Sequence, residues 1–318
     1  MNREILLRVE HLSKEFPVKG KKATLKAVQD VSFTLNKGET LGIVGESGCG
    51  KSTLGRLVLR LLEPTGGRVV FEDEDLTALS QKELRDRRRE FQMIFQDPYA
   101  SFDPRKTIKK ILEEPLAAHK VPADQRQALI ERMLSVTGLP LDALKRYPHE
   151  FSGGQRQRIG IARALILNPK LIIADEPVAA LDVSIQAQIL NLLMDLQKEF
   201  GLSMIFIAHN LATVQYISRR IIVMYLGHVV EIADADELYE NPCHPYTQAL
   251  ISSIPMPDPE IRKEAKGIEG EIPSPIDPPS GCVFRTRCPY ASETCAADIP
   301  VLKETEPGHF VACDYFNK

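Results

Sequence analysis

The chain has 318 residues, of which 43% are hydrophobic and 26% charged, enough to bury one large core and carry a smaller appendage. Its formal net charge of −3 provides no basic footprint for nucleic acid, and the arginines at 85–89 lie next to Glu83, Asp86 and Glu90, as on a solvated helix face. The start of the chain lacks a signal-peptide pattern and no apolar run is long enough to cross a bilayer, so we expect a chain that is neither secreted nor membrane-spanning.

A glycine-rich loop at residues 45–53 lies between the apolar run Leu41–Val44 and a helical pattern at Leu54–Leu62. Strand, loop and helix in this order are typical of a phosphate-binding loop, whose backbone amides and helix N-terminus surround an anion. Lys51 would supply a mobile positive charge and Ser52 a magnesium ligand. The sequence therefore predicts a nucleotide-binding protein, and the alternative is a glycine-rich turn without a ligand. The loop consists of Gly45, Glu46, Ser47, Gly48, Cys49, Gly50, Lys51, Ser52 and Thr53.

Short apolar runs alternate with longer helical patterns along most of the chain, which predicts an α/β core around a largely parallel sheet. Between Ser101 and Glu150 the pattern is helical without a strand-like run, so we expect a helical insertion there. The expected strands are Leu41–Val44, Val69–Phe71, Met93–Phe95, Leu171–Ala174 and Met204–Ala208, and the clearest expected helix is Ile185–Phe200.

The buried-strand pattern from Leu171 ends in the two acids Asp175 and Glu176. Open α/β sheets present groups to ligands at the carboxyl ends of their strands. Asp175 is a candidate for holding magnesium, directly or through water, and Glu176 for polarising an attacking water in phosphoryl transfer. A strand that ends in acids by chance is the alternative.

A second helix start follows Phe151, where Ser152 occupies an N-cap position and Gly153 and Gly154 leave their amides uncovered. Together with Gln155, these residues precede the apolar helix pattern Ile159–Leu167. The segment is a candidate anion-binding helix start, and a plain capped helix is the alternative.

Together these segments resemble an ATP-binding cassette (ABC) ATPase over about residues 6–233. The resemblance rests on their order and spacing, with Gln96 after the strand at 93–95, Asp182 in Ala180-Leu181-Asp182, and His209 after the last apolar run. It implies an ATPase with a RecA-like P-loop NTPase core, mostly parallel, together with an antiparallel β subdomain and an inserted helical subdomain.

The resemblance also implies roles at the matching positions. Residues 45–53 would be the Walker A loop, Asp175 the Walker B acid with Ser52 and Gln96 as further magnesium ligands, and Glu176 the general base. Gln96 would belong to the Q-loop and His209 would be the switch histidine, both with catalytic roles. Ser152, Gly153, Gly154 and Gln155 would be the signature, Asp182 the D-loop acid, and Phe16 the aromatic residue that stacks on adenine; a core or loop aromatic is the alternative for Phe16.

In such ATPases the signature helix of one cassette faces the γ-phosphate held by the phosphate loop of another, so two helix N-termini clamp one ATP. A chain with one loop and one signature therefore needs a partner cassette. ATP binding would close the pair and hydrolysis would release it.

After about residue 236 the composition changes, with nine prolines between Pro242 and Pro279, and the sheet pattern is expected to have ended. Four of the six cysteines follow, at intervals that suit a cubane iron–sulfur cluster better than the paired knuckles of a zinc ribbon. Zinc and reduced structural thiols remain alternatives. These cysteines are Cys282, Cys288, Cys295 and Cys313, whereas Cys49 and Cys243 are not expected to be ligands.

The segment Asn241–Leu250 with its His-Pro-Tyr motif, followed by the cysteine region, resembles the ATPases of oligopeptide and dipeptide importers, and residues 175–188 resemble their F-type subunit. That resemblance implies a [4Fe-4S] cluster, ATP and Mg²⁺ as cofactors, a sister ATPase in a heterodimer, two membrane permeases, and an extracytoplasmic substrate-binding protein. It also implies a peripheral location on the cytoplasmic face of the membrane, without nucleic acid. A nickel or glutathione cargo and a soluble non-transport cassette protein are the alternatives.

The expected domains are an ATP-binding core at 1–100 and 159–235, a helical signature subdomain at 101–158, and a cysteine-rich C-terminal extension at 236–318.

Overall fold

The computed structural model describes residues 4–20, 22–254 and 270–316. These residues form two compact units, which are described one after the other. The first unit takes in the start of the chain through Leu6, Leu35–Glu39 and Ala78–Phe206, and the second takes in Leu7–Thr34, Thr40–Thr77 and the chain from Ile207 onward. None of the described helices is both long enough and apolar enough to span a membrane.

The first unit contains parallel strands that are largely buried. Strand β6 pairs in parallel with β7, with Met93 opposite Ile173, and β7 neighbours β8 in the strand order. All five residues of β7 and of β8 are buried, as expected for central strands of a parallel sheet. The strands are β6 (Phe91–Ile94), β7 (Leu171–Asp175) and β8 (Ser203–Ile207).

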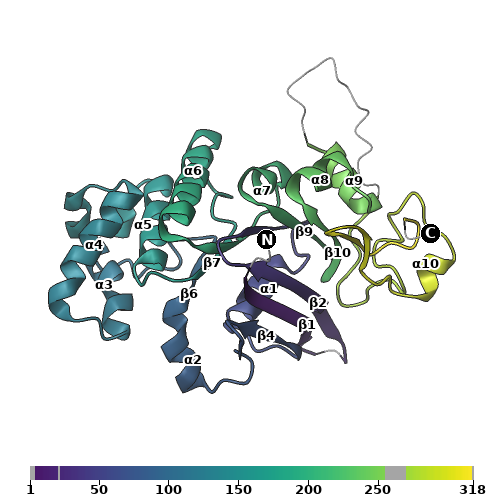
Figure 1. Cartoon of the computed structure of the whole chain (residues 1–318), viewed down its shortest axis with the longest axis horizontal. Helices are drawn as coiled ribbons and strands as arrows, with labels where there is room; N and C mark the ends of the chain where they lie inside the picture. The colour runs from purple at the N-terminus through teal and green to yellow at the C-terminus, as the bar shows by residue number, and fades with distance from the viewer. Residues whose placement is uncertain (1–3, 21, 255–269, 317–318) are drawn as a thin grey trace, which may run out of the picture. The chain divides into compact units, whose positions relative to one another are not determined.

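Helices make up the rest of the first unit, and α3, α4 and α5 lie together in Figure 1. Helix α3 buries Ile108, Ile111 and Leu112 at helical spacing. No strand is assigned between residues 101 and 150, all of which are described, so the predicted helical insertion is confirmed. The helices are α2 (Gln81–Arg87), α3 (Ile108–Ala118), α4 (Ala123–Thr137), α5 (Gly153–Leu165) and α6 (Val183–Phe200), with short 3₁₀ turns at Arg88–Glu90, Leu141–Lys145 and Pro148–Glu150.

The second unit contains two groups of strands. In one, β3 pairs in parallel with β9, β9 pairs antiparallel with β10, and β10 continues through β12 to β11. In the other, the strand order is β2-β1-β4-β5 and the β1–β4 and β4–β5 pairs are antiparallel, which agrees with the expected antiparallel β subdomain. The strands are β1 (Ile5–Pro17), β2 (Thr24–Asn36), β3 (Thr40–Val44), β4 (Gly66–Phe71), β5 (Glu74–Asp75), β9 (Arg220–Tyr225), β10 (His228–Asp234), β11 (Lys303–Glu306) and β12 (His309–Val311).

The expectation that the sheet pattern ends before residue 236 is wrong. Strand β12 pairs with β10, with Phe310 opposite Ile232, and β11 adds a further strand at the edge. Strand β11 is fully exposed and reads Lys-Glu-Thr-Glu, so it carries none of the apolar alternation that marks a strand in a sequence. The C-terminal region is therefore built onto the sheet of the second unit.

The helices of the second unit are mostly short. They are α1 (Lys51–Val58), α7 (Leu211–Ile217), α8 (Ala235–Glu240), α9 (Pro245–Ser252) and α10 (Thr294–Ala297). The pattern at Leu54–Leu62 predicts the helix after the glycine-rich loop too late at both ends. The helix begins at Lys51 and ends at Val58, because Leu59 caps it and Arg60 adopts a left-handed backbone with φ of 51°.

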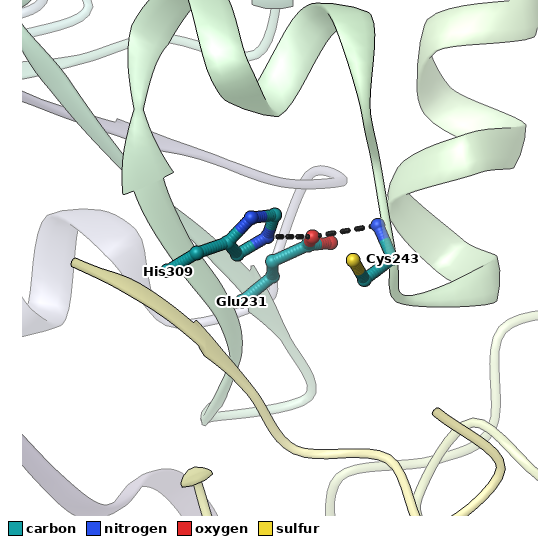
Figure 2. Close-up of side chains that lie close together, drawn as sticks. All are labelled: Glu231, Cys243 and His309. Atoms are coloured by element: carbon teal, nitrogen blue, oxygen red, sulfur yellow. Dashed lines mark hydrogen bonds and ion pairs between the residues drawn. The ribbon is translucent and has the colours of Figure 1, made fainter. Parts of the chain in front are cut away.

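A buried carboxylate joins the C-terminal region to β10, as Figure 2 shows. Glu231 is fully buried, and its Oε1 lies 2.7 Å from Nε2 of His309 on β12. The same carboxylate accepts the backbone N–H of Cys243 at 2.8 Å and that of His244 at 3.0 Å. The hydrogen bond to Glu231 raises the pKa of His309, which favours an imidazolium beside the carboxylate. One side chain thus fixes two segments that lie far apart in the sequence.

Replacing Glu231 with Ala is expected to loosen both segments, because His309 and two backbone amides lose their buried acceptor at a cost of about 3–5 kcal/mol. Hydrogen exchange followed by mass spectrometry should show faster exchange at 243–247 and 309–312. The matched control is Glu237→Ala, which removes an exposed carboxylate that bonds the side chain of Asn241. Wild-type protection in the Glu231 variant would contradict this role.

Candidate functional site

The glycine-rich loop at 45–53 connects β3 to α1 in the second unit, as the sequence predicts. Lys51 is buried, and its Nζ donates to the carbonyl oxygens of Gly45 at 2.8 Å and Glu46 at 3.0 Å. The backbone at the start of the loop therefore holds the Lys51 ammonium in place. Burial raises the pKa of the Cys49 thiol, against the opposing effect of Lys51, so this cysteine is a neutral packing residue.

The loop needs glycine at position 50 for two reasons. The backbone there has φ of +106°, and a Cβ atom would lie 2.2 Å from the carbonyl oxygen of Ala27. Gly48 also has a positive φ, of +78°, but a Cβ there would meet no atom within 4 Å. Of these two glycines, only Gly50 is constrained by the close approach of β2.

In the first unit, β7 ends at Asp175 and Glu176 follows directly. Asp175 is 1% exposed, whereas Glu176 is half-buried and adopts a left-handed backbone with φ of 46°. Such a conformation costs a non-glycine residue about 1–3 kcal/mol and is concentrated at functional sites. Gln96, which follows β6, donates from Nε2 to Oε2 of Glu176 at 2.9 Å. The parallel pairing of β6 and β7 thus brings together two residues that the sequence assigns to catalysis.

The segment Ser152–Gln155 begins α5 in the first unit. The Ser152 hydroxyl accepts the N–H of Gln155, and the Gln155 side chain accepts the N–H of Ser152, which forms a capping box. A Cβ on Gly154 would lie 2.6 Å from Cγ2 of Ile185 on α6, so glycine permits the helix start to pack closely there. The predicted helix start is confirmed, and its ligand stays a prediction.

The remaining candidates take separate positions. Asp182 is the N-cap residue of α6 in the first unit. His209 is exposed and lies between β8 and α7 in the second unit. Phe16 is half-buried near the end of β1, and the ammonium of Lys14 lies 5.1 Å from its ring centroid. Their proposed contacts with a nucleotide remain predictions.

The four C-terminal cysteines carry free thiols and all lie in the second unit. The Cys282 N–H donates to the carbonyl of Cys295 at 2.8 Å, which joins two of the four positions. Burial, together with smaller effects from the charges of the other three thiolates, raises the pKa of Cys282 to about 11. Ser292 lowers the pKa of Cys295 through hydrogen bonds.

Glu231, Cys243 and His309 form a separate grouping of potential metal ligands, whose ligand atoms lie within 4.8 Å of one another. Across residues 4–20, 22–254 and 270–316 this is the one such grouping found, and the four C-terminal cysteines are not part of it. The Glu231 carboxylate already makes the hydrogen bonds with His309 and the Cys243 N–H that Figure 2 draws, and it also accepts the N–H of His244.

Two residues near the glycine-rich loop have no counterpart among the sequence predictions of site residues. The hydroxyl of Tyr246 accepts the N–H of Glu46 at 2.9 Å, and Arg287 pairs with the Glu46 carboxylate. Both partners lie at least 200 positions from Glu46 in the sequence, so no local spacing signals the contacts. The His-Pro-Tyr motif is the sequence signal that could have identified Tyr246.

Comparison with known protein families gives two matches. The ABC transporter family matches residues 28–179, and the oligopeptide/dipeptide transporter C-terminal region matches residues 230–295.

The putative oligopeptide transport ATP-binding protein YkfD of Bacillus subtilis is 56% identical over 320 residues, covering 99% of this chain and 97% of the relative. AppF, an oligopeptide transport ATP-binding protein of the same organism, is 52% identical and covers 99% of both chains. A putative peptide import ATP-binding protein of Brucella ovis is 55% identical and covers 97% of both chains.

Solved structures agree with these relatives. The dimeric ATP-binding cassette MJ0796, bound to ADP and phosphate after hydrolysis, superposes with a TM-score of 0.66 at 28% identity and covers 72% of this chain and 99% of its own. CbiO1 from Clostridium perfringens, part of an ABC transporter complex, has a TM-score of 0.66 at 27% identity, with 75% and 92% covered.

Replacing Gly50 with Ala should destabilise the chain more than replacing Gly48 with Ala. Both changes force alanine into a left-handed backbone, at about 1–2 kcal/mol, but only the first also drives a methyl group against the Ala27 carbonyl. Thermal unfolding of the two full-length variants without nucleotide measures the difference. Equal unfolding temperatures would show that the loop can move away from β2.

Proposed function

The chain belongs to the ABC transporter family, and from this membership we propose that it is the ATP-hydrolysing subunit that energises peptide import through separate membrane permeases. The observation that carries the proposal is the near full-length identity to peptide transport ATP-binding proteins, which includes the C-terminal region. No specific observation favours nickel or glutathione as cargo, or a soluble non-transport role.

The residue roles follow from the family motifs and agree with the local geometry of each unit. The amides of residues 45–53 bind the phosphates, Lys51 supplies positive charge, and Ser52, Asp175 and Gln96 bind Mg²⁺. Glu176 polarises the attacking water, and its hydrogen bond with Gln96 orients the carboxylate. His209 acts as the switch histidine, and Phe16 stacks on the adenine.

The signature acts on a second nucleotide. Ser152, Gly153, Gly154 and Gln155 present the N-terminus of α5 to the γ-phosphate bound by a partner cassette, with Asp182 at the same interface. The solved structure of MJ0796 is dimeric, which supports a paired arrangement. The resemblance of residues 175–188 to F-type subunits supports a sister ATPase rather than a second copy as that partner.

The assembled importer would contain this subunit, its sister ATPase, two membrane permeases and an extracytoplasmic substrate-binding protein. The ATPase would lie peripherally on the cytoplasmic face of the membrane. Docking would use the helical region between α3 and α5, next to the Gln96 loop. The cargo is selected by the permeases and the binding protein, because the ATPase does not contact it.

The cysteine region fits a [4Fe-4S] cluster. Cys282, Cys288, Cys295 and Cys313 are free thiols of one unit that influence one another's ionisation, and four thiolates are the usual ligand set for such a cluster. When bound, the cluster would supply a covalent cross-link among the four segments and a centre able to exchange one electron. Zinc is the alternative metal for four thiolates.

Replacing Glu176 with Gln should reduce ATP hydrolysis by the assembled transporter at least about a hundredfold while leaving ATP binding intact, because it removes the base and keeps the shape. Peptide uptake into proteoliposomes should be lost in parallel. Glu199→Gln, on the exposed end of α6, is the matched control. Uptake at the wild-type rate in the Glu176 variant would refute the proposed function.

Replacing Cys288 with Ser should remove iron and sulfide from anaerobically purified protein and abolish its visible absorption, since the cluster would lose one of four ligands. Cys243→Ser should leave iron and sulfide unchanged. Finding zinc instead of iron in the wild-type protein would contradict the proposed cluster and support zinc as the bound metal.

A further inference from the structure

Glu46, the second residue of the glycine-rich loop, has each of its three polar groups held by a different partner. Its N–H donates to the hydroxyl of Tyr246 at 2.9 Å, and its carbonyl accepts from Lys51 at 3.0 Å. Its carboxylate accepts two bonds from Arg287, at 2.8 and 3.2 Å. Two of these three partners come from the C-terminal region, so that region defines where Glu46 lies.

The Arg287–Glu46 pair is a strong contact of its kind. The two terminal guanidinium nitrogens each donate to a different carboxylate oxygen, which gives the bidentate geometry that adds strength and direction to an ion pair. The Arg287 side chain is only 6% exposed and that of Glu46 23%, so water screens the pair much less than a surface salt bridge. Arg287 also donates to the hydroxyl of Tyr225 at 3.3 Å, which fixes the guanidinium from a second side.

The second contact, from Tyr246, depends on the His-Pro-Tyr motif. His244 caps α9 by accepting the Tyr246 N–H at its Nδ1, and Pro245 occupies the first helical position, where no N–H is needed. Burial lowers the pKa of His244 to about 4, so the imidazole is neutral and Nδ1 is free to accept. The backbone N–H of His244 is in turn bonded to Glu231. The motif therefore aims the tyrosine hydroxyl at the loop from a fixed helix start.

The two contacts share one apolar support. The rings of Tyr225, Tyr246 and Phe284 lie with centroids 4.8–5.4 Å apart, and all three are at most 1% exposed. The Phe284 carbonyl also accepts the N–H of Arg287. The turn that carries the arginine therefore begins at the residue whose ring contacts Tyr246. Aromatic contacts of this kind resist small displacements because the ring faces are buried on both sides.

From this geometry we propose that Arg287 and Tyr246 are positioning residues for nucleotide binding, which hold Glu46 so that its carbonyl fixes Lys51 in the phosphate-binding loop. The inference rests on the proposed role of Lys51 and goes beyond it, because it assigns the C-terminal region a direct part in setting ATP affinity. Neither residue contacts the nucleotide in this scheme. Each acts by increasing the fraction of loops that are ready to bind.

The scheme predicts a specific kinetic pattern. If only a fraction of loops is competent, the apparent dissociation constant increases by the inverse of that fraction, while the rate at saturating ATP is preserved. Arg287→Ala should therefore raise the Kd and KM for ATP by about tenfold, the usual size of a charged hydrogen bond, and leave kcat within about twofold. A purely structural defect would instead lower the amount of active protein, and with it kcat, at an unchanged KM.

The experiment measures ATP binding by the full-length chain and ATP hydrolysis by the assembled transporter for matched variants. Tyr246→Phe removes one hydroxyl and keeps the ring, and Arg287→Lys keeps the charge but loses the bidentate geometry, so both test the contacts if Arg287→Ala fails to fold. The control is Arg285→Ala, since Arg285 lies in the same turn and bonds Ser280. It should leave Kd and KM unchanged.

A double-mutant cycle tests whether Arg287 acts through Glu46. Glu46→Ala and Arg287→Ala should each raise the Kd, and the double variant should raise it no further than either single change. Additive effects, or a folded Arg287→Ala and Tyr246→Phe with wild-type KM, would overturn the inference. Lys51→Ala distinguishes failure of the proposed loop role from failure of the inference. If Lys51→Ala leaves ATP binding intact, the proposed role of the loop fails and the inference fails with it. If Lys51→Ala abolishes binding while the Arg287 and Tyr246 variants bind ATP like the wild type, only the inference fails.

Discussion

The C-terminal half of the second unit depends on the contacts made by the fully buried carboxylate of Glu231. A carboxylate removed from water must be compensated on both oxygens, and here an imidazole and two backbone amides provide that compensation. The partners come from β12 and from the segment that begins α9. Satisfying one charge therefore fixes the position of a strand and of a helix start, and the helix start directs Tyr246 to the glycine-rich loop.

This chain of contacts connects the C-terminal region to the glycine-rich loop at 45–53, which precedes it by almost two hundred residues in the sequence. From Glu231 the contacts run through His244 and Tyr246 to Glu46, and a second route arrives through Arg287. Every step is a hydrogen bond between groups that are buried or half-buried, where such bonds are stronger than in water. The glycine-rich loop at 45–53 is thus held by the C-terminal region as well as by β3 and α1.

The sequence could predict the elements whose signals are local. The apolar runs of β3, β7 and β8 are buried on both sides, so they stand out as strands, and the strand–loop–helix order identifies the glycine-rich loop. It could not predict β11, because an exposed polar edge strand has no apolar pattern. Nor could it predict the partners of Glu46 and Glu231, since Arg287 is 241 positions from Glu46 and His309 is 78 positions from Glu231. Such pairs are set by tertiary packing, and a residue type alone does not reveal them.

Arg287 links the cysteine region to the glycine-rich loop at 45–53. Arg287 directly precedes Cys288, one of the proposed cluster ligands, and its turn is closed by the bond from its N–H to Phe284. Because a bidentate pair tolerates little displacement, the position of the Arg287 backbone, next to Cys288, is coupled to the position of the Glu46 carboxylate. Arg287, which lies next to Cys288, and Tyr246 of the His-Pro-Tyr motif therefore bond the same residue, Glu46, although the two segments look unrelated in the sequence.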